Sequence, residues 1–313
     1  MKLIFFGTSE FAVPALRSIK EKTDWQIELV ISESAKPQGR KNEVIDSPVS
    51  RYAKSVGLNL ITPNSLSDID WSKYNPDLAI VAAYGRIIPR NIFSVPRMGT
   101  VNIHPSLLPK LRGPSPIQTT LLAGLKKTGV SLMLIDEKID HGAIISQDFL
   151  SVSQTDSYFS LEPKLAELGA KMITRDLPLY LNGELKPAEQ NHSEATFTKM
   201  IKKEDGRVGW SKSADEIYNQ WRAFIKWPGI YTFFNNKSGQ QIRLKLIEIE
   251  KCPTSDVGQK QAGEVFTDES KNLYITCRDG AIKITKLQPE NSKILTAQEF
   301  LNGYSYVIGQ ILE

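Results

Sequence analysis

The sequence predicts an α/β domain built on a parallel sheet, followed by a small antiparallel β-barrel. Two observations lead to this prediction. In the first third of the chain, short apolar runs alternate with segments long enough for a crossover helix, which is the pattern of a parallel sheet with helices on both faces. In the last third, apolar residues recur at every second position in short runs separated by turn residues, as in small barrels.

The first third contains the runs that we interpret as buried strands. They are Leu3–Phe6, Ile27–Ile31, Leu58–Ile61, Leu78–Ala82 and Thr100–Ile103. Ligands bind at the carboxyl ends of the strands in such sheets, so the following turns matter most. Residues 33–48 predict a long polar loop, of a length typical of a lid or binding loop. A second unusual turn begins at Asn102 and contains His104 and Pro105.

A long amphipathic helix is expected from Asp156 to Leu181, where apolar residues follow helical spacing and Asn182-Gly183 supplies a stop. The stretch from Lys186 to Gly206 is polar and has few apolar residues, so we place a domain boundary there.

The last third of the chain has a different pattern of apolar and turn residues. Ser213 and Glu216 predict a capping box at the start of a helix. Alternation at Ile242, Leu244 and Leu246 then slips by one residue, and Arg278-Asp279-Gly280 predicts a hairpin turn. Several short strands and one helix favour a small barrel, of the kind found in oligonucleotide-binding domains.

Composition excludes several classes of protein. The 313 residues are 41% hydrophobic and 24% charged, with a net charge of +4, as in ordinary globular proteins. No apolar run is long enough to span a membrane, so we expect a cytoplasmic protein without a membrane partner. GxGxxG, P-loop, HExxH and clustered Cys/His motifs are all missing, which argues against a nucleotide fingerprint or a metal. Between Lys199 and Lys251, the sequence contains eleven basic and six acidic residues.

Asn102 and His104 are the leading candidates for chemistry. Side chains two positions apart on a strand point to the same face. A neighbouring amide and imidazole suit a tetrahedral intermediate, because one holds an oxyanion while the other handles a proton. The competing interpretation is a histidine that caps the following turn. A carboxylate partner would favour catalysis; Asp140 is the leading source, and Asp136 is its rival.

These residues resemble the signature of the folate-dependent formyltransferases. The match is carried by Asn102-Ile103-His104-Pro105-Ser106-Leu107-Leu108-Pro109, by Arg112–Gln118 and by Asp140-His141-Gly142. It extends along the chain through AYGRIIP (83–89), RAFIKWPG (222–229) and residues 283–303. The matches in the last third are similar to those members of the family whose acceptor is a charged initiator tRNA.

The resemblance implies a Rossmann-like catalytic domain over residues 1–186, a linker over 187–206 and an OB-like tRNA-binding domain over 207–313. Its co-substrate would be 10-formyltetrahydrofolate, without a metal, and its partners methionyl initiator tRNA and tetrahydrofolate, with the enzyme acting as a monomer. Carried over by position, the catalytic residues would be Asn102, His104 and Asp140. The residues lining the folate site would be Ser106, Leu107, Leu108 and Pro109. Arg40 would be a lid arginine that inserts toward the acceptor end of the tRNA.

Two alternatives stay open at this stage. One is a formyltransferase that acts on a nucleotide-linked amino sugar, with the same catalytic trio and a different second domain. The other is an RNA-binding protein with a vestigial catalytic half, against which the intact Asn102, His104 and Asp140 argue.

Overall fold

The computed structural model describes residues 1–38, 43–252 and 260–312, and it divides into two compact units. Unit 1 comprises Met1–Pro116, Lys126–Val152 and Ser160–Lys199. Unit 2 comprises Met200–Glu313 together with two short segments, Ile117–Leu125 and Ser153–Phe159. The α/β fold class and the second, antiparallel β domain are both confirmed.

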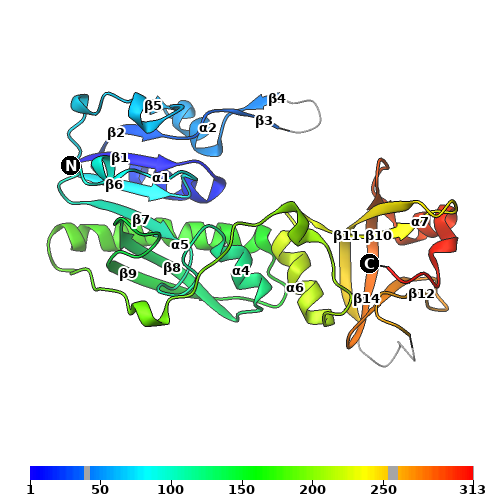
Figure 1. The fold of residues 1–313 in the computed structure, drawn as a ribbon. Helices are drawn as coiled ribbons and strands as arrows, with labels where there is room; N and C mark the ends of the chain where they lie inside the picture. Colours follow the sequence, from blue (N-terminus) through cyan, green and yellow to red (C-terminus); the bar gives the residue numbers. More distant parts are fainter. Residues whose placement is uncertain (39–42, 253–259, 313) are drawn as a thin grey trace. The chain divides into compact units, whose positions relative to one another are not determined.

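Unit 1 is built on a seven-stranded sheet with the order β5-β2-β1-β6-β7-β8-β9 (Figure 1). Its strands are β1 (Lys2–Gly7), β2 (Gln26–Ile31), β5 (Leu60–Ile61), β6 (Leu78–Ala82), β7 (Thr100–His104), β8 (Lys127–Leu134) and β9 (Ile144–Ser151). The five predicted strands all form and pair in parallel. Strands β8 and β9 add an antiparallel edge, so the sheet is mixed.

The helices of the first third are short: α1 (Val13–Lys22), α2 (Pro48–Ser55) and α3 (Arg90–Phe93). The prediction of a crossover helix between β5 and β6 is wrong, because this segment forms only two 3-10 turns, Leu66–Asp68 and Trp71–Lys73. Ser65 and Asp70 explain the difference, since each side chain accepts a hydrogen bond from a backbone N–H two residues on. Such local bonds compete with helix formation.

The predicted polar loop over residues 33–48 is partly an antiparallel hairpin, made of β3 (Lys36–Gln38) and β4 (Glu43–Ile45). Lys36 and Gln38 pair with Ile45 and Glu43 in this hairpin. Arg40, the proposed lid arginine, lies outside the described residues.

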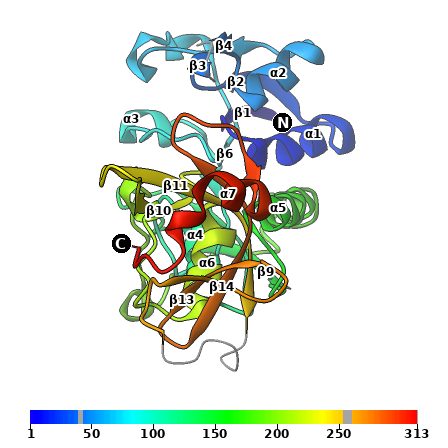
Figure 2. The ribbon, with the colours of Figure 1, turned by 90° about the vertical axis from the view of Figure 1, so that its right-hand side faces the viewer.

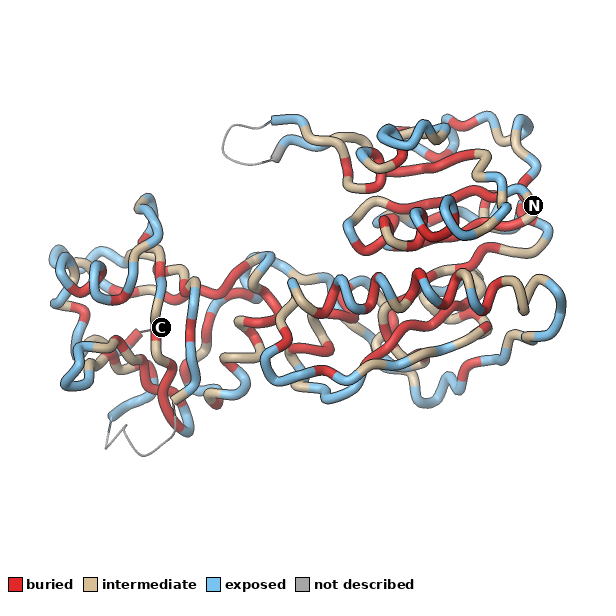
Figure 3. Tube along the Cα trace, turned by 180° about the vertical axis from the view of Figure 1, so that it is seen from behind, coloured by how far each residue is buried: buried red, intermediate tan, exposed pale blue. Residues whose placement is uncertain are grey.

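The long helix α5 (Tyr158–Leu181) confirms the amphipathic pattern. It contacts the sheet at Gly169, where an added Cβ would lie 2.8 Å from Ile103 Cγ2. Gly183, at φ +77°, follows the end of the helix, and its N–H donates to the carbonyl of Tyr180. Figure 3 shows buried residues concentrated along the central strands of this unit, in agreement with the fully buried β6.

Unit 2 contains α4 (Pro116–Leu122) beyond its first residue, α6 (Ala214–Phe224) and α7 (Ala297–Tyr304). Its sheet has the order β10-β11-β14-β13-β12, with β15 paired to β14 (Figure 2). The strands are β10 (Ile230–Asn235), β11 (Gln241–Cys252), β12 (Val265–Thr267), β13 (Leu273–Cys277), β14 (Gly280–Pro289) and β15 (Leu295–Thr296).

Three local predictions for this unit are confirmed. Ser213 and Glu216 form both hydrogen bonds of the capping box at the start of α6. The alternation slip coincides with a register shift between Leu246 and Glu248. Cys277 pairs with Gly280, so Arg278 and Asp279 form a two-residue hairpin turn.

Arg222 ties the separate pieces of unit 2 together. Its side chain is buried and donates to the carbonyls of Ser153 at 3.2 Å, Asp156 at 3.1 Å and Leu121 at 3.4 Å. One guanidinium on α6 therefore satisfies acceptors on both short segments that join this unit from earlier in the chain.

Replacing Arg222 with Met should lower the free energy of unfolding by at least about 2 kcal/mol, because buried carbonyls lose their donor. The measurement is urea unfolding followed by tryptophan fluorescence. Arg278→Met is the matched control, since Arg278 is exposed and pairs with Glu216 at the surface, where such pairs contribute about 0–1 kcal/mol. Equal urea midpoints for the two variants would contradict this account of Arg222.

Candidate active site

Asn102 and His104 lie at the carboxyl end of β7, two positions apart and therefore on one face of the strand. His104 is buried, with 4% of its surface exposed, and Asn102 is half-buried. The strand thus presents an amide and an imidazole together at the edge where α/β sheets bind ligands.

Asp140 joins them from the turn between β8 and β9. Its Oδ1 accepts a hydrogen bond from Asn102 Nδ2 at 3.3 Å and lies 3.6 Å from His104 Nδ1. Its Oδ2 accepts from the backbone N–H of Gly113 at 2.7 Å. The turn itself is tight, because a Cβ on Gly142 would lie 2.1 Å from the carbonyl oxygen of Leu134. The structure therefore brings the three residues of the predicted trio into one cluster.

The orientation of His104 follows from its second ring nitrogen. Nε2 lies 3.0 Å from the carbonyl oxygen of Leu111. Because a carbonyl can only accept, Nε2 carries a hydrogen and donates it. The remaining nitrogen, Nδ1, is thereby turned toward Asp140, which is the arrangement that a proton relay requires.

Asp136, the rival carboxylate, is occupied elsewhere. Its Oδ2 lies 2.6 Å from His141 Nδ1, and its Oδ1 accepts from the backbone N–H of Lys138 at 2.9 Å. The His141 ring stacks on His192, with ring centroids 3.9 Å apart. Asp140 is therefore the carboxylate that faces His104.

The four residues expected to line a folate site form a tightly held turn. Ser131 Oγ donates to the carbonyl of Ser106 at 2.6 Å and accepts from the N–H of Leu108 at 3.1 Å. Gln147 Nε2 donates to the carbonyl of Leu108 at 2.8 Å. Ser106 and Leu108 are buried, whereas Leu107 and Pro109 are partly exposed, so the latter two present the surface of this turn.

Two family models together match most of the chain. The model described as formyl transferase matches residues 1–177, and the model of the formyl transferase C-terminal domain matches residues 200–305. The chain belongs to the formyl transferase family. It is a formyl-transferring enzyme of that family, and both family models match along it.

Full-length relatives agree with this assignment. The chain is 35% identical over 317 residues to the methionyl-tRNA formyltransferase of Caldicellulosiruptor saccharolyticus, covering 100% of both chains. It is 34% identical over 312 residues to the enzyme of that name from Myxococcus xanthus, covering 98% of this chain and 96% of the relative.

Solved structures share the formyltransferase fold. An N-formyltransferase from Helicobacter canadensis, in complex with folinic acid and dTDP-3-aminofucose, superposes with a TM-score of 0.66 at 21% identity, covering 91% of this chain and 98% of that one. HypX from Aquifex aeolicus, in complex with tetrahydrofolic acid, gives a TM-score of 0.64 at 20% identity, covering 96% of this chain and 47% of that one.

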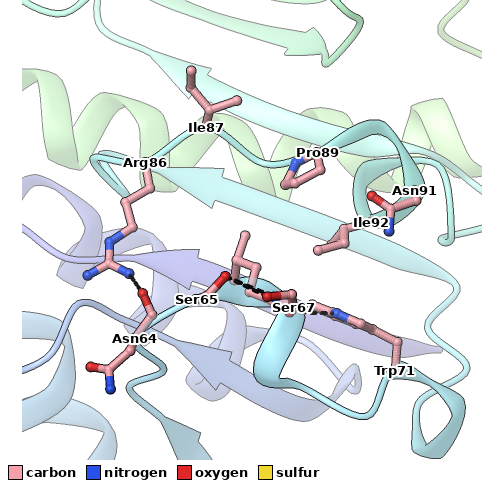
Figure 4. A pocket seen from close by; sticks show the side chains of 10 residues that line it. Asn64, Ser65, Ser67, Trp71, Arg86, Ile87, Pro89, Asn91 and Ile92 are labelled. Atoms are coloured by element: carbon pink, nitrogen blue, oxygen red, sulfur yellow. Dashed lines mark hydrogen bonds between the residues drawn. The ribbon is translucent and has the colours of Figure 1, made fainter.

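The AYGRIIP segment lines a surface hollow of about 420 Å³ in unit 1 (Figure 4). Arg86, Ile87 and Pro89 form one side, and Asn64, Ser65, Ser67 and Trp71 the other. Arg86 Nη1 closes one end by donating to the carbonyl of Asn64 at 2.7 Å. This segment, which carried part of the family resemblance, thus forms a wall of a hollow whose residues are separate from the trio.

The described residues show neither a metal cluster nor a membrane span. Within residues 1–38, 43–252 and 260–312, no three His, Cys, Asp or Glu side chains gather as metal ligands would. None of the helices in that part of the chain combines the length and apolar character that a bilayer crossing requires.

Sequence reasoning missed Gly113, Arg112 and Gln190, which surround the trio. Arg112–Gln118 was recognised only as part of a motif, and Gln190 fell in a stretch interpreted as a linker because it has few apolar residues. No periodic signal marks such residues, since their partners lie up to 80 positions away in the chain.

Alanine at Asn102, His104 or Asp140 should each lower kcat of formyl transfer by about 10²–10³, the usual cost of losing one preorganised group. Each variant should still unfold cooperatively on heating, with a lowered Tm where a buried partner is lost, as for the Leu111 carbonyl in His104→Ala and the Gly113 N–H in Asp140→Ala. The kcat of the triple variant should be only slightly lower than that of the slowest single variant, because the effects of residues that act as a unit are not additive. Asp136→Ala is the control and should stay within threefold of wild-type kcat; a normal rate in any trio variant would remove that residue from the mechanism.

Proposed function

We propose that this chain transfers the formyl group of 10-formyltetrahydrofolate to the α-amine of methionyl initiator tRNA, giving the formylated tRNA used in translation initiation. The observation that carries the proposal is the full-length match to proteins named methionyl-tRNA formyltransferase, which includes the C-terminal domain as well as the catalytic one.

The geometry of the trio supports the chemistry. During the reaction the bond between the formyl carbon and N10 of the folate breaks, and a new bond joins that carbon to the amine nitrogen. One N–H of Asn102 is directed to Asp140 at 3.3 Å, which leaves the second N–H to stabilise the oxyanion, as preorganised donors do.

Asp140 and His104 would move the proton. The amine must lose a proton on attack and N10 must gain one on leaving, so the net transfer is from amine to folate. The cluster at 3.6 Å between His104 Nδ1 and Asp140 Oδ1 can relay that proton through water. Ser106–Pro109 would contact the folate, with Leu107 and Pro109 as the exposed members.

Unit 2 supplies a surface suited to a nucleic acid backbone. On adjacent strands, Arg243 and Lys245 lie opposite Phe233 and Tyr231, with the Arg243 guanidinium 3.8 Å from the centre of the Tyr231 ring. Within the described residues neither cation forms an ion pair, whereas Lys251 on the same strand pairs with Asp215 at 2.5 Å. Unpaired cations beside aromatic rings are typical of phosphate-binding surfaces.

The remaining parts of the proposal concern Arg40, assembly and location. Arg40 would contact the acceptor end of the tRNA, as the family resemblance implies. We expect the enzyme to act as a monomer. A charged tRNA substrate would place the activity in the cytoplasm, where translation takes place.

The proposed function is tested by offering labelled 10-formyltetrahydrofolate with one acceptor at a time: methionyl initiator tRNA, free methionine, or a nucleotide-linked amino sugar. We expect label in the tRNA alone. Preferential label in the amino sugar would support the alternative acceptor and overturn the proposal.

Lys245→Gln should weaken binding of charged tRNA and reduce the slope of log K against log salt concentration by about 0.7–0.9, the value for one phosphate contact. Fluorescence anisotropy at several salt concentrations measures it. Lys251→Gln, on the same strand, serves as the control because its charge is already neutralised by Asp215. The same slope in wild type and both variants would contradict a phosphate contact by Lys245.

A further inference from the structure

We propose that residues 188–198, called here the strap, position the catalytic turn around Asp140, and that Gln190 is the positioning residue through which they act. The strap falls within the stretch that sequence reasoning assigned to a linker. The inference rests on the proposed function for its kinetic test, but it also has a test that needs no activity.

The strap holds the catalytic turn directly. Gln190 Nε2 donates to the carbonyl of Asp140 at 3.0 Å and to the carbonyl of Gly142 at 2.7 Å. Gln190 is buried, with 5% of its surface exposed. Ala188 extends the contact, because its backbone exchanges two 2.8 Å hydrogen bonds with Ile144 at the start of β9.

The other end of the strap holds the loop that carries Gly113. The N–H of Arg112 donates to the carbonyl of Thr196 at 2.9 Å, and the N–H of Thr198 donates back to the carbonyl of Arg112 at 2.7 Å. Thr198 Oγ1 accepts from the N–H of Ser115 at 3.1 Å. Gly113 packs so closely that a Cβ would lie 2.9 Å from Thr198 Oγ1. The donor to Asp140 Oδ2 is therefore held by the strap as well.

Arg112 joins the two ends. Its buried guanidinium donates to Gln190 Oε1 from Nε at 3.1 Å and from Nη2 at 2.6 Å. Because guanidinium only donates, these bonds fix the amide oxygen of Gln190 on that side and turn its NH₂ toward the two carbonyls. Nη2 also donates to His192 Nδ1 at 2.9 Å. Loss of solvent around the ring, then the charges of His141 and Arg112, lower the pKa of His192, which suits an accepting nitrogen.

The catalytic turn needs such support. Asp140 adopts φ +49°, a left-handed conformation that is strained for a residue other than glycine. Bonds to its own carbonyl and to that of Gly142 oppose relaxation of the turn. A displacement of about 1 Å at a reacting group can cost about 10² in rate, so a small relaxation would be visible in kcat.

Gln190→Glu is the decisive variant. It preserves size and the acceptor for Arg112, but it removes both N–H donors and places a carboxylate oxygen against two carbonyls. The control is Gln220→Glu in unit 2, where a glutamine with 2% exposure also donates to two carbonyls, those of Asp205 at 2.7 Å and Arg207 at 3.0 Å. The two substitutions are therefore chemically alike. They differ in that Gln190 bonds to carbonyls of the turn around Asp140, whereas Gln220 bonds to carbonyls in unit 2.

We expect Gln190→Glu to lower kcat at least tenfold while KM for folate and for tRNA changes less than threefold. We also expect the Gly113 amide to exchange its hydrogen at least tenfold faster. Gln220→Glu should leave kcat within twofold and Gly113 exchange unchanged. A normal kcat in Gln190→Glu, unchanged Gly113 exchange, or an equal loss of kcat in the control would overturn the proposal.

Two further measures keep the test decisive. If Gln190→Glu does not fold, Thr198→Val replaces it, because it removes the acceptor of the Ser115 N–H without changing the shape of the side chain. We expect kcat to fall at least threefold and the Gly113 amide to exchange faster. If both quantities stay at their wild-type values, the proposal is refuted. If the wild-type protein does not formylate charged tRNA, the proposed function fails, whereas the exchange of the Gly113 amide still tests the strap independently.

Discussion

The carboxylate of Asp140 joins the residues of the predicted catalytic trio into one cluster in unit 1. Its two oxygens take a backbone N–H from Gly113 at 2.7 Å and an amide N–H from Asn102 at 3.3 Å, and one of them faces His104 at 3.6 Å. Asn102 and His104 come from β7, and Gly113 comes from the loop that follows it. These contacts orient Asn102, His104 and the Gly113 backbone around one carboxylate.

The topology of the sheet makes this convergence possible. Strand β7 is the last of the parallel strands, and antiparallel β8 ends at Leu134 beside Val101, near the start of β7. The turn from β8 to β9 begins there, and Asp140 within it reaches Asn102 and His104. In this chain the antiparallel hairpin β8–β9 supplies the carboxylate that meets Asn102 and His104 near the carboxyl end of β7.

Features with local causes could be predicted from the sequence, and those with distant causes could not. The capping box at Ser213, the hairpin at Arg278-Asp279 and the pair Asn102–His104 each depend on neighbours within a few residues. The helix expected between β5 and β6 failed because side chains such as Ser65 bond to their own backbone instead. Gln190 was missed because its partner Arg112 lies 78 residues away, and nothing in a polar stretch signals which polar residue will be buried.

The central claim is that the negative charge of Asp140, held beside Asn102 and His104, is needed for catalysis. The most direct measurement is kcat of Asp140→Asn, because the carboxamide keeps the shape of the side chain and an oxygen that can accept from Gly113, while the charge is lost. The account predicts a fall of at least about 10² in kcat with the Gly113 amide still protected from exchange. A rate within threefold of wild type would contradict it.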